Sequence, residues 1–266
     1  MKLYAVIAFH YVEDRLQYLE QTLSSLIDID SEFTKIVIQT SDVTDAQYKK
    51  LKMILNHQPK NIEIEVEPIR NLKDPYMLTW AHKCRMLDFL DTPMTHFAYL
   101  EDDMVLTQDL VDYWEDVRGR FKKRNLNFIP GFFRIELKEG RAYAVDVIKP
   151  FQVNQLNGVV LDRRYVSLPQ PYQGCFLMDK ELVEEHIKSA SFSPETCRKI
   201  PATENDTRER ANMGNMYENI PEGFAHRMMI PLDIFPQCWI HHCANTYSNM
   251  PDNPNGKIPA ERIFNY

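Results

Sequence analysis

Three carboxylates in the middle of the chain could perform chemistry: Glu101, Asp102 and Asp103 directly follow the strand-like run HFAYL (96–100). Adjacent like charges in a poorly solvated position repel one another, and a divalent cation relieves that repulsion. In an extended stretch Glu101 and Asp103 point to one side, so these two can converge on one ligand. Carboxylate oxygens favour Mg²⁺ or Mn²⁺, which keep positions open for diphosphate oxygens. The alternative is a solvated acidic turn that caps the next helix through Thr107.

The residues before the triplet alternate between strand and helix patterns. Short β-branched or aromatic runs indicate strands, and leucines spaced by three or four indicate helices. The expected strands are 3–9, 34–40, 61–67 and 96–100, and the expected helices are 16–26, 44–56 with Thr44 as its cap, and 75–90. This alternation predicts an α/β fold with a mostly parallel, doubly wound sheet flanked by helices. The triplet then lies at the carboxyl end of a core strand, where such sheets bind ligands.

The second half of the chain is less regular. A helix is expected over 109–123, a hairpin from 128–137 and 142–148 around Gly140, and a strand over 174–178 that leads into a helix over 180–189. Residues 234–242 end the regular structure, and the Asn/Pro-rich tail after Ala244 is typical of an ordered loop or lid. No repeat or linker divides the chain, so we expect one domain over 1–266, with halves 1–110 and 111–266.

Composition excludes several classes of protein. The 266 residues carry a net charge of -7, so no broad cationic face is available to bind nucleic acid. No two of the eight glycines stand two positions apart, which excludes the G-x-G-x-x-G dinucleotide loop. The Walker phosphate loop and the G-x-S-x-G nucleophile elbow are absent as well.

The longest apolar run, Leu3–Phe9, has seven residues, far fewer than the roughly 20 that span a bilayer. Charged residues follow it without a small-residue cleavage site, so a secretory signal is not expected. The five scattered cysteines are typical of free thiols in a reducing compartment. These features predict a cytoplasmic protein without a transmembrane span, and peripheral contact with a membrane is left open.

The run YLEDDMVLT (99–107), together with LTWAHK (78–83) and the first strand-loop-helix, resembles the GT-A class of nucleotide-sugar glycosyltransferases. The resemblance covers about residues 1–110 and implies a GT-A-like sheet with a C-terminal acceptor-binding half. In that class an acidic D-x-D-type motif holds the metal that bridges the sugar-nucleotide diphosphate. Carried over, Asp103 is the direct metal ligand, Glu101 is a second ligand or a water-mediated or ribose contact, and Asp102 belongs to the donor site.

A second match is WIHHCANTYS (239–248), which is similar to the HHG-x-S-type strand end of GT-A enzymes. That match implies His242 as a further metal ligand or diphosphate contact, although Cys243 and Ala244 replace the usual glycine. An imidazole beside carboxylates is an ordinary Mn²⁺ ligand set. A zinc site is the alternative, but the adjacent His-His-Cys spacing lacks the paired C-x₂-C geometry of structural zinc sites.

A nucleotide bound after the first strand requires groups that contact its base, ribose and phosphates. Aromatic residues there offer stacking surface, and an arginine on the first helical turn offers a fixed charge. The candidates are Phe9, His10, Tyr11, Arg15, Asp42 and Arg70. His82 and Lys83 stand in mid-helix and are expected on a solvated face.

Inverting sugar transfer needs a carboxylate that deprotonates the acceptor hydroxyl. In inverting GT-A enzymes an acidic element precedes a helix in the second half, and the segment 202–215 is similar to it. The resemblance implies Glu209 as the preferred base, followed by Asp206, with Glu204 also open. The alternative is a solvated helix face on which Arg208 and Arg210 form ion pairs. The sequence does not decide between inversion and retention.

The acceptor side is predicted from a cluster of aromatic and polar residues in the second half. Most of the aromatic side chains belong to the core, while Arg134, Gln173 and Trp239 are the candidates for acceptor binding. The whole cluster is Phe132, Phe133, Arg134, Glu136, Tyr172, Gln173 and Trp239.

These observations predict a Mn²⁺- or Mg²⁺-dependent, hexosyltransferase-like enzyme that moves a sugar from a UDP- or GDP-sugar to a glycan or lipid-linked hydroxyl acceptor. A nucleotidyltransferase is one alternative, but it would show a glycine-rich basic loop where this chain has FHYVEDR (9–15). A catalytically degenerate protein that binds sugar nucleotides or glycans is the other.

Overall fold

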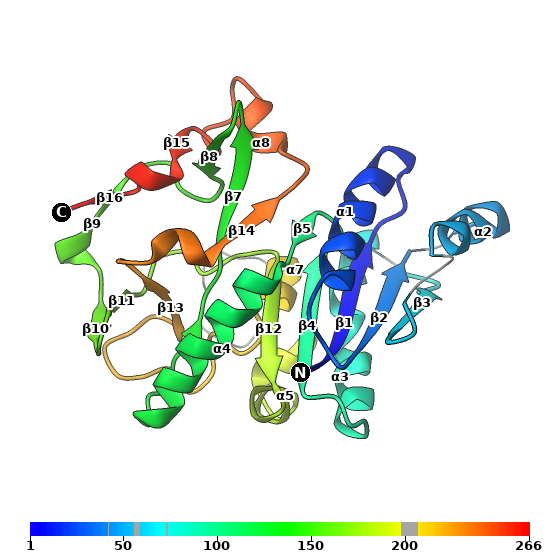
Figure 1. The fold of residues 1–266 in the computed structure, drawn as a ribbon, viewed down its shortest axis with the longest axis horizontal. Coiled ribbons are helices and arrows are strands. Elements are labelled where there is room, and N and C mark those ends of the chain that lie inside the picture. Colours follow the sequence, from blue (N-terminus) through cyan, green and yellow to red (C-terminus); the bar gives the residue numbers. More distant parts are fainter. Residues whose placement is uncertain (42, 56–58, 73, 198–206) are drawn as a thin grey trace. The chain divides into compact units, whose positions relative to one another are not determined.

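The computed structural model describes residues 1–41, 43–55, 59–72, 74–197 and 207–266 (Figure 1). The chain forms two compact units. Unit 1 comprises Met1–Asp103 and Gly174–Asn215, and unit 2 comprises Met104–Gln173 and Met216–Tyr266. The functional division at residue 110 stays a prediction.

Unit 1 is built on a five-stranded sheet of order β12-β4-β1-β2-β3 (Figure 1). The first four strands along the chain are parallel, and β12 joins the edge of the sheet antiparallel to β4. This confirms the predicted α/β fold with a mostly parallel sheet. The strands are β1 (Lys2–Phe9), β2 (Phe33–Thr40), β3 (Ile62–Pro68), β4 (His96–Glu101) and β12 (Cys175–Asp179).

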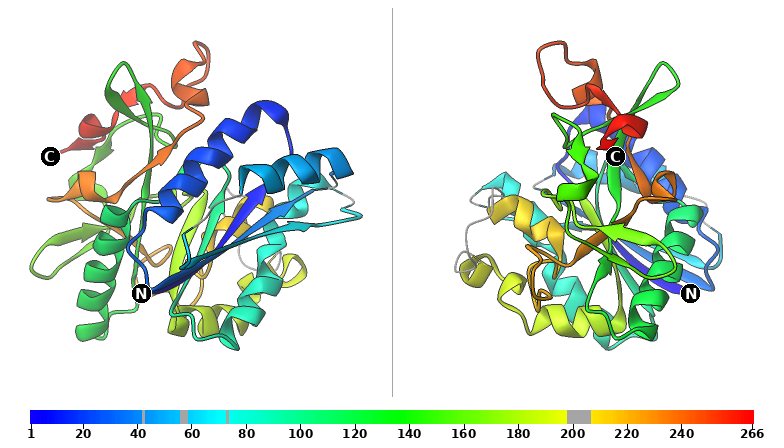
Figure 2. Two further views of the ribbon diagram at one scale, coloured as in Figure 1. Left: turned by 45° about the vertical axis from the view of Figure 1, so that its right-hand side comes forward. Right: turned by 90° about the vertical axis from the view of Figure 1, so that its left-hand side faces the viewer.

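Helices cover both faces of this sheet, as predicted for a doubly wound fold. In Figure 2, α1 and α2 lie on one face, and α3 and α5 lie on the other. The leucines of α1 are buried against the sheet, and Thr44 and Gln47 form a capping box that starts α2. The main helices are α1 (Leu16–Ile27), α2 (Asp45–Ile54), α3 (His82–Leu90) and α5 (Lys180–Ile187). Shorter ones are η1 (Glu13–Arg15), η2 (Pro75–Trp80), η4 (Ala190–Phe192), α6 (Pro194–Cys197), α7 (Thr207–Arg210) and η5 (Ala211–Met213).

The expected single helix over 75–90 is wrong in detail, because a 3-10 helix, η2, precedes α3. The expected solvated face is also wrong, because His82 and Lys83 are both buried. The sheet lies on one side of α3 and α5 packs against it as well, so His82 and Lys83 are enclosed between them. The Lys83 Nζ lies 2.5 Å from His186 Nε2, and burial lowers the pKa of Lys83 to about 7.

Unit 2 consists of small sheets and one long helix, α4 (Gln108–Lys123). The larger sheet has the order β15-β8-β7-β14-β5, and the smaller ones are β10-β11-β13-β6 and β16-β9. Their strands are β5 (Met104–Val105), β6 (Ile129–Pro130), β7 (Phe133–Lys138), β8 (Arg141–Ala144), β9 (Phe151–Gln152), β10 (Gly158–Val160), β11 (Arg164–Val166), β13 (Met228–Pro231), β14 (Trp239–His242), β15 (Ile258–Pro259) and β16 (Phe264–Asn265). The short helices are η3 (Val153–Gln155), η6 (Phe235–Cys238), α8 (Thr246–Asn249) and η7 (Ala260–Arg262).

The predicted hairpin in this unit is confirmed. Strands β7 and β8 pair antiparallel, and Glu139 and Gly140 adopt positive φ angles of 53° and 76° in the turn between them. The Asn/Pro-rich tail is anchored to this hairpin, because β15 pairs with β8. Its closure over a donor stays a prediction.

The five cysteines are all free, as predicted. Within the described ranges, none of the helices combines the length and the apolar character that a membrane crossing requires.

Candidate functional site

The acidic triplet lies at the point where the strand order of unit 1 reverses. From β1 the sheet continues through β2 and β3 on one side and through β4 on the other. The register pairs Ala8, near the end of β1, with Glu101, the last residue of β4. Ligands of open α/β sheets bind outside the carboxyl ends of the strands at such a switch point. The topology therefore places the predicted carboxylates at the expected binding edge.

Arg15 neutralises part of the charge of the triplet. Its Nε and Nη2 donate to the two carboxylate oxygens of Asp102, each at 2.8 Å. Nη2 also donates to Asp103 Oδ2 at 2.8 Å. The short helix η1 places this guanidinium directly after β1, and Thr22 Oγ1 holds the backbone carbonyl of Asp102 at 2.9 Å. The sequence predicts that Arg15 contacts the nucleotide; in the structure its guanidinium binds the two aspartates, and a contact with a nucleotide stays a prediction.

The two aspartates of the triplet are buried beside one shared guanidinium. Asp102 and Asp103 are 5% and 3% exposed, and one guanidinium faces both carboxylates. Burial raises the pKa of Asp102 to about 6, and the neighbouring Asp103 adds to this, while Arg15 opposes it. The hydrogen bonds that Arg15 donates to the two aspartates, together with their negative charge, outweigh the effect of burial on Arg15 and raise its pKa. Three adjacent carboxylates therefore lie at this edge, and two of them share the Arg15 guanidinium.

Glu101 is held on another side by a residue that the sequence analysis did not select. Asn212 Nδ2, from η5, donates to Glu101 Oε1. Asn212 is 1% exposed, so this amide is part of the packed interior of unit 1. Only the fold brings η5 to the end of β4, and no sequence pattern marks this asparagine.

The donor atoms at this edge fit a hard divalent cation. Glu101 and Asp103 supply carboxylate oxygens, and Arg15 forms an ion pair with Asp103. Across the described residues, no three or more His, Cys, Asp and Glu side chains are grouped to hold a metal ion. The binding of Mg²⁺ or Mn²⁺ at this edge stays a prediction; such ions take one or two carboxylates and complete their coordination with water and substrate phosphates.

The other predicted donor contacts of unit 1 lie in different surroundings. His10 is exposed after β1, and its Nδ1 lies 2.9 Å from Ser41 Oγ, after β2. Phe9 is fully buried, with its ring 5.6 Å from that of Tyr11. Arg70 is exposed beyond the end of β3. Asp42 lies outside the described residues.

The preferred base, Glu209, is in the short helix α7, whereas Asp206 and Glu204 lie outside the described residues. Trp80 Nε1 donates to the carbonyl oxygen of Thr207 at 3.0 Å and ties α7 to η2. The neighbouring arginines bind within unit 1. Arg208 stacks 4.7 Å from the ring centroid of Tyr76, and the buried Arg210 donates to the Cys197 carbonyl oxygen at 2.9 Å.

In unit 2, His242 forms part of a buried hydrogen-bond network. Its Nδ1 lies 2.7 Å from Oε1 of the fully buried Glu136, on the adjacent strand β7. Glu136 also accepts from the backbone N–H groups of Tyr247 and Ser248, in α8. Burial alone would raise the pKa of Glu136, but the hydrogen bonds from His242 and α8 outweigh it and lower that pKa. The structure places Asp103 and His242 in different units, so their joint binding of one cation stays a prediction.

Two of the predicted acceptor residues are held by partners within unit 2. Arg134 forms a bidentate ion pair with Asp146, at 2.6 and 2.9 Å, and lies 4.8 Å from the ring centroid of Tyr172. Gln173 is 1% exposed, and its Oε1 accepts from the backbone N–H of Phe132 at 2.5 Å. Acceptor binding by these two side chains stays a prediction.

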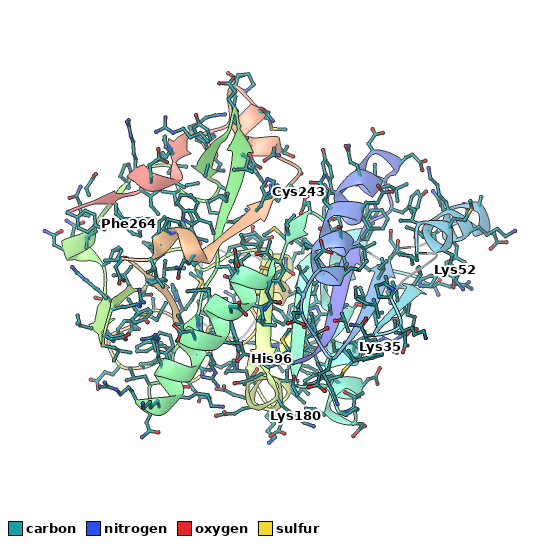
Figure 3. All side chains as sticks on the ribbon, in the orientation of Figure 1. Lys35, Lys52, His96, Lys180, Cys243 and Phe264 are labelled. Carbon is teal, nitrogen blue, oxygen red and sulfur yellow. The ribbon has the colours of Figure 1, made fainter. Side chains whose placement is uncertain are left out.

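Trp239 is the third predicted acceptor-binding residue, and it borders an open groove of about 660 Å³ in unit 2. Residues of α4 form one side of the groove and residues around η6 form the other. The lining residues are Thr107, Asp109, Leu110, Asp112, Tyr113, Asp116, Ile234, Pro236, Gln237 and Trp239. Trp239 begins β14, whose far end precedes Cys243, labelled in Figure 3.

No family model and no curated protein matches this sequence. The fold is similar to three crystal structures of S. aureus TarS. The structure of its residues 1–349 is 11% identical, covers 93% of this chain and 63% of that one, and has a TM-score of 0.41. A second TarS structure is 12% identical, covers 74% of this chain and 33% of that one, and has a TM-score of 0.38. A complex of TarS residues 1–349 with UDP is 12% identical, covers 70% of this chain and 48% of that one, and has a TM-score of 0.37. This chain thus spans 63% or less of the TarS chains that it matches.

Proposed function

We propose that this chain is a metal-dependent glycosyltransferase of GT-A type that uses a nucleotide-diphosphate sugar as donor. The observation that carries the proposal is the acidic triplet at the switch point between β1 and β4. Adjacent carboxylates at that edge suit a cation together with the phosphates that it binds. The donor is a UDP- or GDP-sugar, and the acceptor is a glycan or lipid-linked hydroxyl compound.

In this proposal Asp103 binds Mn²⁺ or Mg²⁺ with help from Glu101, and His242 is a further ligand. The bound cation offsets the charge that develops on the departing diphosphate. The register of unit 2 supports the role of His242: it pairs with Met104, the residue that follows Asp103 in the chain. Arg15 holds Asp102 and Asp103 in place and contributes a second positive charge at the donor site.

The groups that act on the acceptor in this proposal come from the segment 202–215 and from the aromatic and polar cluster of the second half. Glu209 deprotonates the acceptor hydroxyl in an inverting reaction, with Asp206 and Glu204 as the other candidates. Trp239 offers an aromatic surface beside the groove of α4, whose carboxylates accept hydrogen bonds from sugar hydroxyl groups. Arg134 and Gln173 complete the acceptor side.

The test measures nucleotide release from UDP-, GDP-, CMP- and dTDP-sugars with and without Mn²⁺. We expect Mn²⁺-dependent turnover of one donor, and a loss of roughly 100-fold in kcat for Asp103→Asn. Asp88→Asn is the matched control. It removes the same charge from unit 1, at an exposed side chain that pairs with Arg85. Full Mn²⁺-dependent activity in Asp103→Asn would contradict the assignment of the metal ligand.

A second candidate is a protein that binds sugar nucleotides without transferring the sugar. The observation that favours it is the hydrogen bonding of Arg15 to both aspartates, which gives the site its own cation. This candidate predicts a rise in Tm with a sugar nucleotide that does not depend on Mn²⁺, without turnover. The two candidates are therefore separated by thermal-shift and nucleotide-release measurements on the same samples.

A further inference from the structure

Glu136 is the centre of the polar network in unit 2. Its side chain is 0% exposed, yet it contacts three donor positions on two elements: His242 Nδ1 on β14 and the backbone N–H groups of Tyr247 and Ser248 on α8. A buried carboxylate with this number of donors is held in its ionised form. The network therefore joins strand β7 to β14 and to the start of α8 through a single charged group.

The chemistry of Glu136 determines where the proton of His242 resides. An ionised carboxylate only accepts hydrogen bonds, so the Nδ1 atom at 2.7 Å must carry a proton. In a neutral imidazole the other nitrogen, Nε2, then carries the lone pair. A buried carboxylate bonded to Nδ1 also fixes the orientation of the ring, as it does for histidines that bind metals.

The adjacent histidine has the opposite arrangement. His241 Nε2 lies 3.2 Å from Asn245 Oδ1. The same Oδ1 accepts from the backbone N–H of Leu137, and Asn245 Nδ2 donates to the Cys243 carbonyl oxygen, so the orientation of this amide is defined by two further bonds. His241 therefore donates from Nε2 and carries its lone pair on Nδ1. Strand alternation places the two rings on opposite faces of β14.

We propose that Glu136 is a positioning residue that keeps His242 in the Nδ1–H tautomer and makes Nε2 its ligand atom. The tautomer follows from the network alone, whereas the role of Nε2 as a ligand of Mn²⁺ rests on the proposed function. The contrast with His241 explains which histidine of the pair serves the site. The backbone bonds to α8 additionally fix the carboxylate, so that the ring is oriented before any ligand binds.

The tautomers can be measured in the metal-free protein by two-bond ¹H–¹⁵N NMR correlations of the imidazole rings. His241→Gln and His242→Gln assign the signals. We expect a protonated Nδ1 for His242 and a protonated Nε2 for His241. A protonated Nε2 on His242 in the wild-type protein overturns the proposal without any variant of Glu136.

Glu136→Gln tests whether the Glu136 carboxylate determines the tautomer of His242. An amide has one acceptor oxygen and cannot accept from all three donors, so the population of the Nε2–H tautomer of His242 rises. We expect Mn²⁺ affinity, measured from the EPR signal of free Mn²⁺, to fall about tenfold or more. Glu261→Gln, which breaks an exposed ion pair with Arg141 in the same unit, is the matched control and leaves both readouts unchanged.

The outcomes separate this inference from the proposed function. An unchanged tautomer and unchanged Mn²⁺ affinity in a folded Glu136→Gln variant overturn the inference. Absence of Mn²⁺ binding by the wild-type protein overturns the proposed metal chemistry, and the NMR signals of His242 still decide the role of Glu136.

Discussion

Unit 1 buries two clusters of ionisable side chains that differ in their charge. At the end of β4, Asp102 and Asp103 share the guanidinium of Arg15. Between α3 and α5, the amine of Lys83 has a neutral acceptor, His186 Nε2, and the rings of Trp80, Phe176 and Phe192 lie 5.5 to 5.9 Å away. The first cluster remains charged, and the second loses its charge when Lys83 releases a proton near neutral pH.

Under the proposed function, the first cluster binds a ligand and the second is structural. Adjacent carboxylates at the carboxyl ends of the strands of a sheet can hold a cation together with phosphates. An amine enclosed by aromatic rings gains nothing from solvent or ligand, and burial simply favours its neutral form. Substitutions that change each cluster should therefore have different consequences for stability, pH dependence and metal affinity.

The largest expected effect comes from removing the cation of the first cluster. Arg15→Met removes the guanidinium that the two buried carboxylates share. We expect a loss of about 3 kcal/mol in the free energy of unfolding, at the low end for a buried pair because the Arg15 side chain is 33% exposed. Urea unfolding at neutral pH measures this loss.

Lys50→Met is the matched control for Arg15→Met. Lys50 pairs with Glu13 near the same short helix, but both side chains are largely exposed. We expect a change within about 0.5 kcal/mol. Equal losses in the two variants would show that Arg15 does not stabilise the buried aspartates.

The second prediction concerns the pH dependence that Lys83 confers. Its pKa is about 7 in the folded protein and 10.5 in the unfolded chain. Between these values the unfolded chain binds one more proton, so stability rises with pH by up to about 1.4 kcal/mol per unit. We expect this rise between pH 7 and 8.5 in the wild-type protein and its absence in Lys83→Met.

The groups that face Lys83 define the controls for this measurement. They are His186 on α5, Cys197 at the end of α6 and His82 on α3 itself; burial lowers the pKa of both histidines well below this range. Subtracting the Lys83→Met curve from the wild-type curve removes contributions shared by both proteins. A difference that does not change with pH would contradict a neutral, buried Lys83.

The same two clusters show what the sequence could predict. The acidic triplet was found because an apolar run followed by carboxylates is a local pattern, and the sheet that positions it follows from strand and helix periodicity. The partner of Asp102 is 87 residues away and that of Lys83 is 103 residues away. Local periodicity assigned Lys83 to solvent because packing of α5 against α3 is a tertiary event. The bond between Glu136 and His242, across 106 residues, was missed for the same reason.

The smallest expected effect tests whether the backbone of the first cluster is held for binding. Thr22 Oγ1 donates to the Asp102 carbonyl oxygen at 2.9 Å, and Ser189 Oγ donates to the His186 carbonyl oxygen at 2.7 Å in the second cluster. Thr22→Val and Ser189→Ala each remove one such bond, so both should cost about 1 kcal/mol in urea unfolding. Mn²⁺ affinity should fall only in Thr22→Val, because only that bond fixes a residue next to Asp103. Equal Mn²⁺ affinities in the two variants would remove the distinction between a binding cluster and a structural one.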